Sequence, residues 1–441
     1  MRVSGGSSRL SLPQAVFAYC CLADAPSWRE DEVRMADSFP ASAAKPQPNA
    51  VPTGLLVVCF ALLCINASFF PTAYVSGGWI WDETGRGIPT DFVNVWAAGK
   101  LALQGHPALA WDWDVQRAIE LDLLKQDFPG YFAWHYPPPF LFVAALLAQF
   151  PYTVAFIGWL AVSFVPYLAV MRAIVGRAFG FLLAAGLPVV FSNTLVGQNG
   201  FLTAALVGGT LYLLPVRPVL AGICLGFLTY KPQYGLLFPI VLIAAGRWTT
   251  FAAAGVTAVA LAGISTVAFG LESWQAFLHW MPHFSQAFLT EGKATWWKLQ
   301  SIFSLVRYCG GSEAIAWAFQ WVLTAAVAVV LVMMWRSPVR YSLKAAALAV
   351  GTLLTTPYLF MYDMMVMAVA AAFLVRVGLK DGFRTHELAA LGCAILLPVT
   401  FILFGIPVGL AANLIVAGII LRRAGPWWRR EPAGAPVAVA A

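Results

Sequence analysis

Residues 51–75, VPTGLLVVCFALLCINASFFPTAYV, decide the fold of this chain. The stretch carries no charged side chain, and a helix needs about 20 apolar residues to cross the hydrocarbon core of a bilayer. It therefore predicts a membrane-spanning helix. The rest of the chain agrees, because 60% of the 441 residues are apolar and only 11% are charged. That composition excludes a water-soluble protein of this length.

The basic balance of the chain indicates membrane topology. Lys and Arg gather on the cytoplasmic side of membrane proteins and aromatic rings at both interfaces, which suits a net charge of +7 together with 18 Trp and 31 Phe. We therefore infer no nucleic-acid partner from the charge. The seven cysteines include no CxxC pair and no ligand spacing, so the sequence favours neither a disulfide framework nor a metal site.

Twelve further apolar runs follow the first, several of them too short to cross alone: 137–150, 153–170, 179–196, 201–214, 219–229, 236–245, 251–269, 314–335, 343–356, 364–375, 388–404 and 408–421. Basic residues at the turns between runs mark the cytoplasmic side and place both termini there. Termini on the same side require an even number of crossings, so one of the candidate runs must be re-entrant. The two runs that meet around Gln149 and Tyr152 are the weakest candidates for crossing. We expect an all-α polytopic membrane protein of about 12 transmembrane helices.

The same orientation divides the chain into functional regions. Residues 1–49, rich in Ser, Ala and Pro, are expected to be a disordered cytoplasmic leader, residues 50–424 the transmembrane domain and residues 425–441 a cytoplasmic tail. Two long polar segments, 76–135 and 270–311, then face the same external compartment. The first is the longest loop and the richest in acidic residues.

Asp91 is the candidate catalytic carboxylate. It lies in Pro89-Thr-Asp-Phe-Val-Asn-Val-Trp96, shortly after the first span. A carboxylate desolvated at a membrane edge has a raised pKa and makes a better general base toward a hydroxyl group. The alternative is structural, since Thr90 or Asp91 before an apolar-periodic stretch is a typical helix N-cap.

Lys231 lies between two short apolar runs, where a cation is costly unless an anion meets it. A lipid phosphate is one such anion; an ordinary lysine that reaches the headgroups is the alternative. Polar groups near other helix breaks are of the kind that orient a sugar, although each is also a common helix cap or interhelical contact. They are Gln198, Asn199, Gln233, Tyr358, Tyr362 and Asp363.

The segment 270–311 mixes Trp, His, Lys and Arg, including Lys298 and Arg307. This mixture suits stacking on sugars and clamping a phosphate, and equally an interfacial amphipathic segment with an aromatic belt. His135 ends the acidic loop, just before a run of prolines that fixes the start of the next helix.

In their order and spacing, these segments resemble glycosyltransferase family 87 of the GT-C superfamily. The resemblance covers about residues 55–380, with no single specific motif. The matching stretches are Asp91-Phe92 with Trp96-Ala-Ala-Gly99 and Gly105, Tyr136-Pro-Pro138, Gly197-Gln-Asn199, Ala221-Gly222, Tyr230-Lys-Pro-Gln233, Ser301-Ile-Phe303, and Pro357-Tyr358 with Tyr362-Asp363.

The resemblance implies a GT-C-type helical bundle and a hexose, mannose-like, delivered from a polyprenyl-phosphate sugar donor to a lipid or glycan acceptor, without cofactor or nucleotide sugar. It implies a bacterial plasma membrane, with the active site facing the periplasm or exterior. Asp91 would be the general base of an inverting transfer. The departing phosphate needs stabilising charge, for which the candidates are Lys231, Arg307, Lys298 and His135; Gln198, Asn199, Gln233, Tyr358, Tyr362 and Asp363 would line the sugar pocket.

A multi-span transporter is the competing interpretation, because broken Gly- and Pro-rich helices also describe carriers. Carriers place substrate contacts near the membrane midplane and need access from both sides. Here the polar groups gather at one face, beside an acidic loop that a carrier does not require.

Overall fold

The long apolar runs of the sequence are helices in the computed structural model, which describes residues 50–426. Five helices of this part are long and apolar enough to cross a membrane: α3 (Thr53–Val75), α7 (Tyr152–Val175), α14 (Trp248–Phe269), α17 (Glu313–Arg336) and η7 with α19 (Met361–Asp381). A sixth is the pair α8 (Phe179–Ala185) and α9 (Pro188–Val196), bent by 55°. The expected count of about 12 spans is thus not confirmed. The expected leader, 1–49, and nearly all of the expected tail, 425–441, lie outside the described residues.

The remaining apolar runs form helices that are too short to span alone: α10 (Gly200–Leu213), α11 (Pro218–Phe227), α13 (Leu237–Ala244) and α18 (Tyr341–Thr355). At 1.5 Å per residue, α10 is about 21 Å long and α14 about 33 Å. Hydrogen bonds hold helix ends together at one end of the bundle: Tyr341 Oη of α18 donates to the Leu211 carbonyl of α10 at 2.5 Å, and Arg336 Nε of α17 donates to the Ala244 carbonyl of α13 at 3.3 Å. The short helix α13 and the long helix α17 therefore end together at this end of the bundle.

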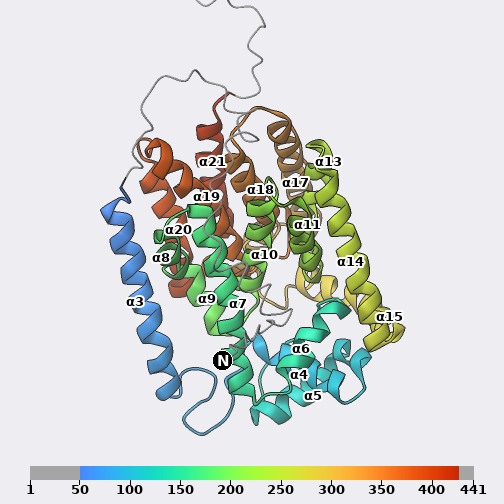
Figure 1. Ribbon diagram of the computed structural model, residues 1–441. Helices are drawn as coiled ribbons and strands as arrows, with labels where there is room; N and C mark the ends of the chain where they lie inside the picture. Colours follow the sequence, from blue (N-terminus) through green and yellow to red (C-terminus); the bar gives the residue numbers. More distant parts are fainter. Residues whose placement is uncertain (1–49, 427–441) are drawn as a thin grey trace, which may run out of the picture. The chain divides into compact units, whose positions relative to one another are not determined.

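The bundle is built around α19 (Met365–Asp381), which packs against α7, α10, α18 and α21 (Gly409–Ala424). Of the most apolar stretch of this span 94% is buried, against 6% for α14 and 17% for α17. The outer helices thus keep wide apolar faces, as lipid-facing helices do. In Figure 1, α3 stands at one edge of the bundle, and α20 (Glu387–Phe404) lies beside α21.

The two long polar segments, 76–135 and 270–311, pack against each other. The first contains α4 (Phe92–Leu103), η2 (Pro107–Trp111) and α5 (Trp113–Leu124); the second contains α15 (Leu271–Ser285), η5 (Gln286–Thr290), η6 (Trp296–Lys298) and α16 (Ile302–Tyr308). They join through aromatic contacts, such as the Trp113 and Trp280 rings stacked at 5.9 Å. Figure 1 places α4, α5 and α15 at the same end of the bundle.

The run 137–150 is no span but η3 (Pro138–Phe140) and α6 (Leu141–Leu147), and α6 packs on α4. Gly99 lies so close to the backbone of α6 that an added Cβ would clash with the Ala144 carbonyl oxygen.

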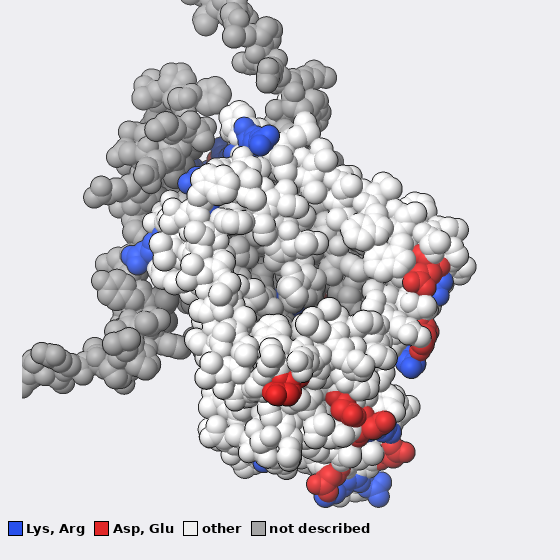
Figure 2. All heavy atoms as spheres, turned by 90° about the vertical axis from the view of Figure 1, so that its right-hand side faces the viewer, with Lys and Arg blue, Asp and Glu red and all other residues white. Residues whose placement is uncertain are grey.

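On the face seen in Figure 2, Asp and Glu gather toward the end that carries the two polar segments, and the charged atoms near the opposite end are mostly Lys and Arg. A broad uncharged band separates the two ends, as the bilayer requires.

Candidate active site

Asp91 immediately precedes α4 but does not cap it. The helix begins at Phe92 with Asp91 in the N-cap position, and no side-chain cap hydrogen bond forms. Instead, Gln198 Nε2 donates to Asp91 Oδ2 at 3.1 Å, from a loop 107 residues further along the chain. The carboxyl is partly buried, and this burial raises its pKa, while the Gln198 bond and the nearby charges of Lys298 and Lys231 act in the opposite direction.

A turn with glycine at both ends places Gln198 beside Asp91. Gly197 has φ +67°, and a Cβ there would meet the Phe92 Cβ at 2.7 Å. A Cβ on Gly200 would meet the Tyr362 carbonyl oxygen at 2.5 Å. Only glycine tolerates both the left-handed backbone and these approaches, so the turn is held between the residue after Asp91 and the residue before Asp363.

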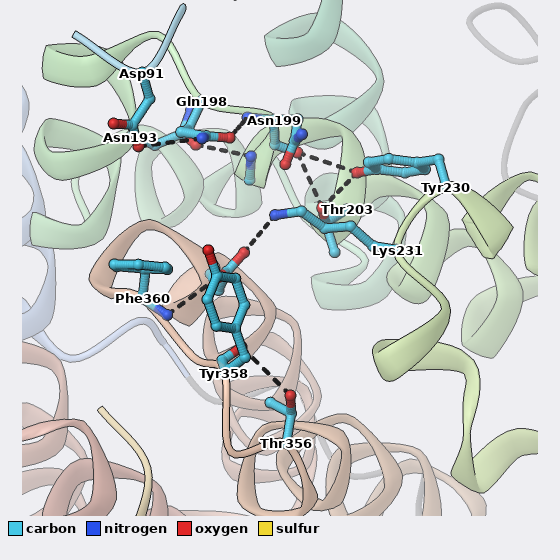
Figure 3. Close-up of polar contacts among 12 residues, drawn as sticks. Asp91, Asn193, Gln198, Asn199, Thr203, Tyr230, Lys231, Thr356, Tyr358 and Phe360 are labelled. Carbon is cyan, nitrogen blue, oxygen red and sulfur yellow. Dashed lines mark hydrogen bonds and ion pairs between the residues drawn. The ribbon is translucent and has the colours of Figure 1, made fainter. Parts of the chain in front are cut away.

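Within this turn, buried partners hold the Gln198 side-chain oxygen and the Asn199 Nδ2 atom, while Asn199 Oδ1 has no hydrogen-bond partner in the part of the chain that the structure describes. Tyr136 Oη donates to Gln198 Oε1 at 3.1 Å, and Asn199 Nδ2 donates to Tyr136 Oη at 2.8 Å. Gln198 Oε1 also accepts a hydrogen bond from the Asn199 backbone N–H at 3.1 Å. These contacts orient the Gln198 amide so that its NH₂ group faces the Asp91 carboxylate (Figure 3).

Lys231 meets a carboxylate of the chain itself. Its Nζ lies 2.6 Å from Asp363 Oδ1, and the two side chains are only 4% and 2% exposed. Asp363 Oδ2 accepts the Phe360 backbone N–H at 3.1 Å, and the ammonium lies 5.2 Å from the centre of the Tyr362 ring. The alternative interpretation of Lys231, as an ordinary lysine that reaches the lipid headgroups, is therefore excluded. Sequence reasoning placed Lys231 and Asp363 in separate roles and missed that they pair.

Tyr358 lies near both Asp91 and Asp363. Figure 3 shows its hydroxyl directed toward the side on which Asp91 and Gln198 lie. Its backbone is fixed by the second polar segment: Gln300 N donates to the Leu359 carbonyl, and Ser301 Oγ donates to the Pro357 carbonyl, both at 2.7 Å. The site thus combines loops that are far apart in sequence.

The other predicted phosphate ligands differ in their placement. Lys298, at the end of η6, is exposed, and its charge is close enough to lower the pKa of Asp91. The His135 ring is partly buried, stacks on Tyr136 at 4.6 Å and lies 5.8 Å from Tyr358. Burial lowers the pKa of this histidine to about 4, so it is neutral at physiological pH.

Arg307 and Gln233 are not brought into the network around Asp91. Arg307 Nη1 donates to the Gly311 carbonyl at 3.1 Å, and Nη2 donates to the Thr290 carbonyl at 3.2 Å. Its guanidinium covers the Trp296 ring at 4.8 Å, so it holds the second polar segment together. Gln233 lies on α12 (Pro232–Gly235), partly buried, two residues after Lys231.

Comparison with known sequences decides the class of protein. The model of glycosyltransferase family 87 matches residues 134–357, about half of the chain. The chain belongs to glycosyltransferase family 87. No curated protein and no solved structure matches it.

The family 87 match includes most of the residues around the turn and Lys231, but Asp91 and Asp363 lie outside the matched residues. The apolar spans and the family together identify a multi-pass membrane glycosyltransferase. Among residues 50–426, no group of three or more His, Cys, Asp or Glu side chains is placed to hold a metal ion.

Three residues of the candidate site were not singled out from the sequence. Tyr136 bridges Gln198 and Asn199, and Tyr230 Oη and Thr203 Oγ1 lie 2.5 Å apart beneath Asn199. Tyr136 and Tyr230 lie in stretches that carried the family resemblance, which was an available signal. Thr203 lies in an apolar helix and gives none, because a helical threonine commonly bonds its own backbone.

Proposed function

We propose that this glycosyltransferase moves a hexose, mannose-like, from a polyprenyl-phosphate sugar to a hydroxyl group of a lipid or glycan acceptor, with inversion and with Asp91 as the general base. The observation that carries the proposal is the contact between Asp91 and Gln198. This contact holds a partly buried carboxylate whose pKa is raised and which lies near the charges of Lys298 and Lys231. This is a suitable environment for a base acting on a sugar hydroxyl.

The step is a single displacement. Asp91 takes the proton of the acceptor hydroxyl as that oxygen attacks the anomeric carbon. The bond from this carbon to the phosphate oxygen breaks, and polyprenyl phosphate leaves with one additional negative charge. Gln198, fixed by Tyr136, holds the carboxylate in place, and such positioning contributes to the rate because the reacting groups need no reorganisation.

The departing phosphate requires cationic or hydrogen-bonding groups where its charge develops. Lys298 is exposed beside Asp91 and is our first candidate. Lys231 lies deeper and is shared with Asp363, and the neutral His135 adds a ring nitrogen. Arg307 is the most remote candidate, because its guanidinium already serves two backbone carbonyls. Gln198, Asn199, Gln233, Tyr358, Tyr362 and Asp363 would surround the sugar.

A lipid-linked donor needs an apolar path for its tail. A hollow of about 430 Å³ between Phe142 of α6 and one face of α14 supports this class of donor, since every residue that lines it is apolar: Phe142, Ala260, Gly263, Ile264, Val267 and Ala268. Both elements end near the polar segments. Because Lys and Arg collect at the opposite end of the bundle, the positive-inside rule favours a periplasmic or exterior active site in a bacterial plasma membrane.

The test compares membranes that contain wild type, Asp91→Asn or Asp127→Asn at matched expression, supplied with radiolabelled polyprenyl-phosphate mannose. Asp127 is the control, because it lies in the same polar segment with an 85% exposed side chain. We expect Asp127→Asn to match wild type and Asp91→Asn to lose about 100-fold or more in transfer. Full transfer by Asp91→Asn would remove the base assignment. A wild type inactive with every polyprenyl-phosphate sugar would remove the donor class.

A further inference from the structure

A second cavity lies at the opposite end of the bundle from Asp91. It has a volume of about 240 Å³ between the start of α20 and the end of α21. The residues that line it are Arg384, His386, Glu387, Ala390, Ile415, Gly418, Ile419, Arg422 and Arg423. Because α19 runs from the Asp363 site to the loop that precedes this cavity, its 17 residues separate the two sites by about 25 Å.

The charges of this cavity do not balance. Arg423 pairs with Glu387 through two nitrogens, at 2.6 and 2.5 Å, and both side chains are at most 5% exposed. The nearby Asp381 pairs with Arg340. Among residues 50–426, the other two guanidinium groups of the cavity, Arg384 and Arg422, have no carboxylate partner.

These two arginines are nevertheless held close together. Arg384 Nη1 donates to the Arg422 carbonyl at 2.6 Å, and Arg422 Nη1 donates to the Thr385 carbonyl at 2.8 Å. Each bond uses one nitrogen, and among residues 50–426 the remaining guanidinium donors of both arginines form no further hydrogen bond to the protein. Two like charges held side by side favour an anion between them.

The backbone at the cavity is also held in an uncommon conformation. His386, which joins Arg384 to Glu387, has φ +64°, and a non-glycine residue in the left-handed region costs free energy that the surrounding contacts must offset. This conformation is fixed by Glu387, whose Oε2 accepts the Arg384 backbone N–H at 2.7 Å. The arginine-bearing loop is therefore preorganised.

We propose that this cavity binds the phosphate of an anionic membrane lipid. The phosphate would lie between Arg384 and Arg422, and the acyl chains would run along the apolar wall formed by Ile415 and Ile419 between α20 and α21. The volume admits a phosphate with its glycerol. Basic pockets between helices at the cytoplasmic interface recognise anionic lipid headgroups in this way.

The full-length protein, delipidated in detergent, tests the proposal by native mass spectrometry with phosphatidylglycerol and phosphatidylcholine, alongside thermal unfolding in each lipid. We expect wild type to retain phosphatidylglycerol in preference and to unfold at a higher temperature with it. Arg384→Gln and Arg422→Gln should each weaken phosphatidylglycerol binding by about fivefold, and the double variant by about 25-fold. Lys380→Gln is the matched control, since Lys380 is an exposed cation at the same end outside the cavity.

Unfolding temperatures without added lipid establish that the variants fold; Arg384→Lys, which keeps the charge, serves if the Gln variant does not fold and should then retain most of the binding. Equal weakening by Lys380→Gln would mean that general surface charge, and not this cavity, attracts the lipid. Equal binding of both lipids by wild type would also overturn the proposal. Protection by inorganic phosphate alone, with displacement of the lipid, would assign the cavity to a soluble anion and remove the lipid.

Discussion

Lys231 Nζ lies 2.6 Å from Asp363 Oδ1, and this ion pair is almost completely buried. It joins the loop after α11 to the short helix before α19, across 132 residues of sequence. The pair explains how a lysine is tolerated between two apolar segments, because each charge removes the desolvation cost of the other only while both are present. Without substrate, the Lys231 ammonium is therefore already neutralised by the Asp363 carboxylate.

Breaking this pair from one side should destabilise the protein strongly. Lys231→Met leaves Asp363 buried without its cation, and Asp363→Leu leaves the ammonium, so each should cost about 3–5 kcal/mol. The double variant should recover most of this loss. Thermal unfolding in detergent measures it, and sugar transfer by the folded double variant measures the role of Lys231. Single variants as stable as wild type would contradict the assignment of a buried pair.

Gly197→Ala should disrupt both folding and transfer, whereas Gly176→Ala should affect folding alone. Both glycines have left-handed φ, +67° and +76°, but an added Cβ at Gly176 meets nothing within 4 Å. The strain common to both is about 1 kcal/mol. At Gly197 the methyl also pushes against Phe92, which follows Asp91. Transfer per folded molecule should fall at least tenfold for Gly197→Ala only; equal losses would show that the close approach has no bearing on the site.

Substitutions of Lys298 and Arg307 should affect different properties, sugar transfer for Lys298 and stability for Arg307. Lys298→Gln removes an exposed charge beside Asp91 and should reduce transfer at saturating donor while leaving the unfolding temperature nearly unchanged. Arg307→Gln removes hydrogen bonds to Thr290 and Gly311 and should lower the unfolding temperature. A charge-assisted hydrogen bond contributes about 1.5–3 kcal/mol. The reverse pattern would make Arg307 the phosphate ligand.

The sequence predicted local features of this arrangement better than contacts between residues far apart in the chain. The run 51–75 became α3 (Thr53–Val75) because a single apolar stretch suffices to specify a spanning helix. Asp91 and Gln198 were both expected at the site and lie in contact. The pairing of Lys231 with Asp363 was not predicted, because no local pattern encodes a contact over such a separation.

The expected count of about 12 spans is not confirmed, and the shorter helices give a physical reason. Helices such as α10 and α18 are surrounded by other helices, so they need not match the thickness of the bilayer. In sequence they look like weak spans, although in the structure they form the short inner walls beneath the site. Arg307 shows the same limit for side chains: its type suits phosphate binding, while its partners are backbone carbonyls of its own segment.

The pH dependence of transfer should report Asp91. Burial raises the pKa of this carboxyl, and the Gln198 hydrogen bond lowers it. A general base works only when deprotonated, so transfer should rise with pH through the raised pKa. Gln198→Leu removes the lowering contact and should shift this rise to higher pH, with the Asp127→Asn profile as the control. An unchanged pH profile in Gln198→Leu would mean that the rise in transfer does not come from the ionisation of Asp91.

Glu120 supplies a prediction about stability that is independent of catalysis. The side chain lies on α5, 1% exposed, and neither of its carboxyl oxygens has a hydrogen-bond partner. Burial raises the pKa of this carboxyl from 4.5 to about 9. The folded protein therefore keeps a proton that the unfolded chain releases between these values. In that window the stability of wild type should fall as pH rises, by about 1.4 kcal/mol per pH unit.

Glu120→Gln removes this titration and keeps the shape of the side chain. Its amide also offers a donor to Gln116 Oε1, which lies one turn earlier on α5 without a partner. The unfolding temperature of the variant should therefore exceed that of wild type by a margin that grows from pH 5.5 to pH 8.5. Glu83→Gln, an exposed carboxylate of the same polar segment, should show no such trend. A margin that stays constant over this range would mean that Glu120 is already ionised in the folded protein, with a cation compensating it.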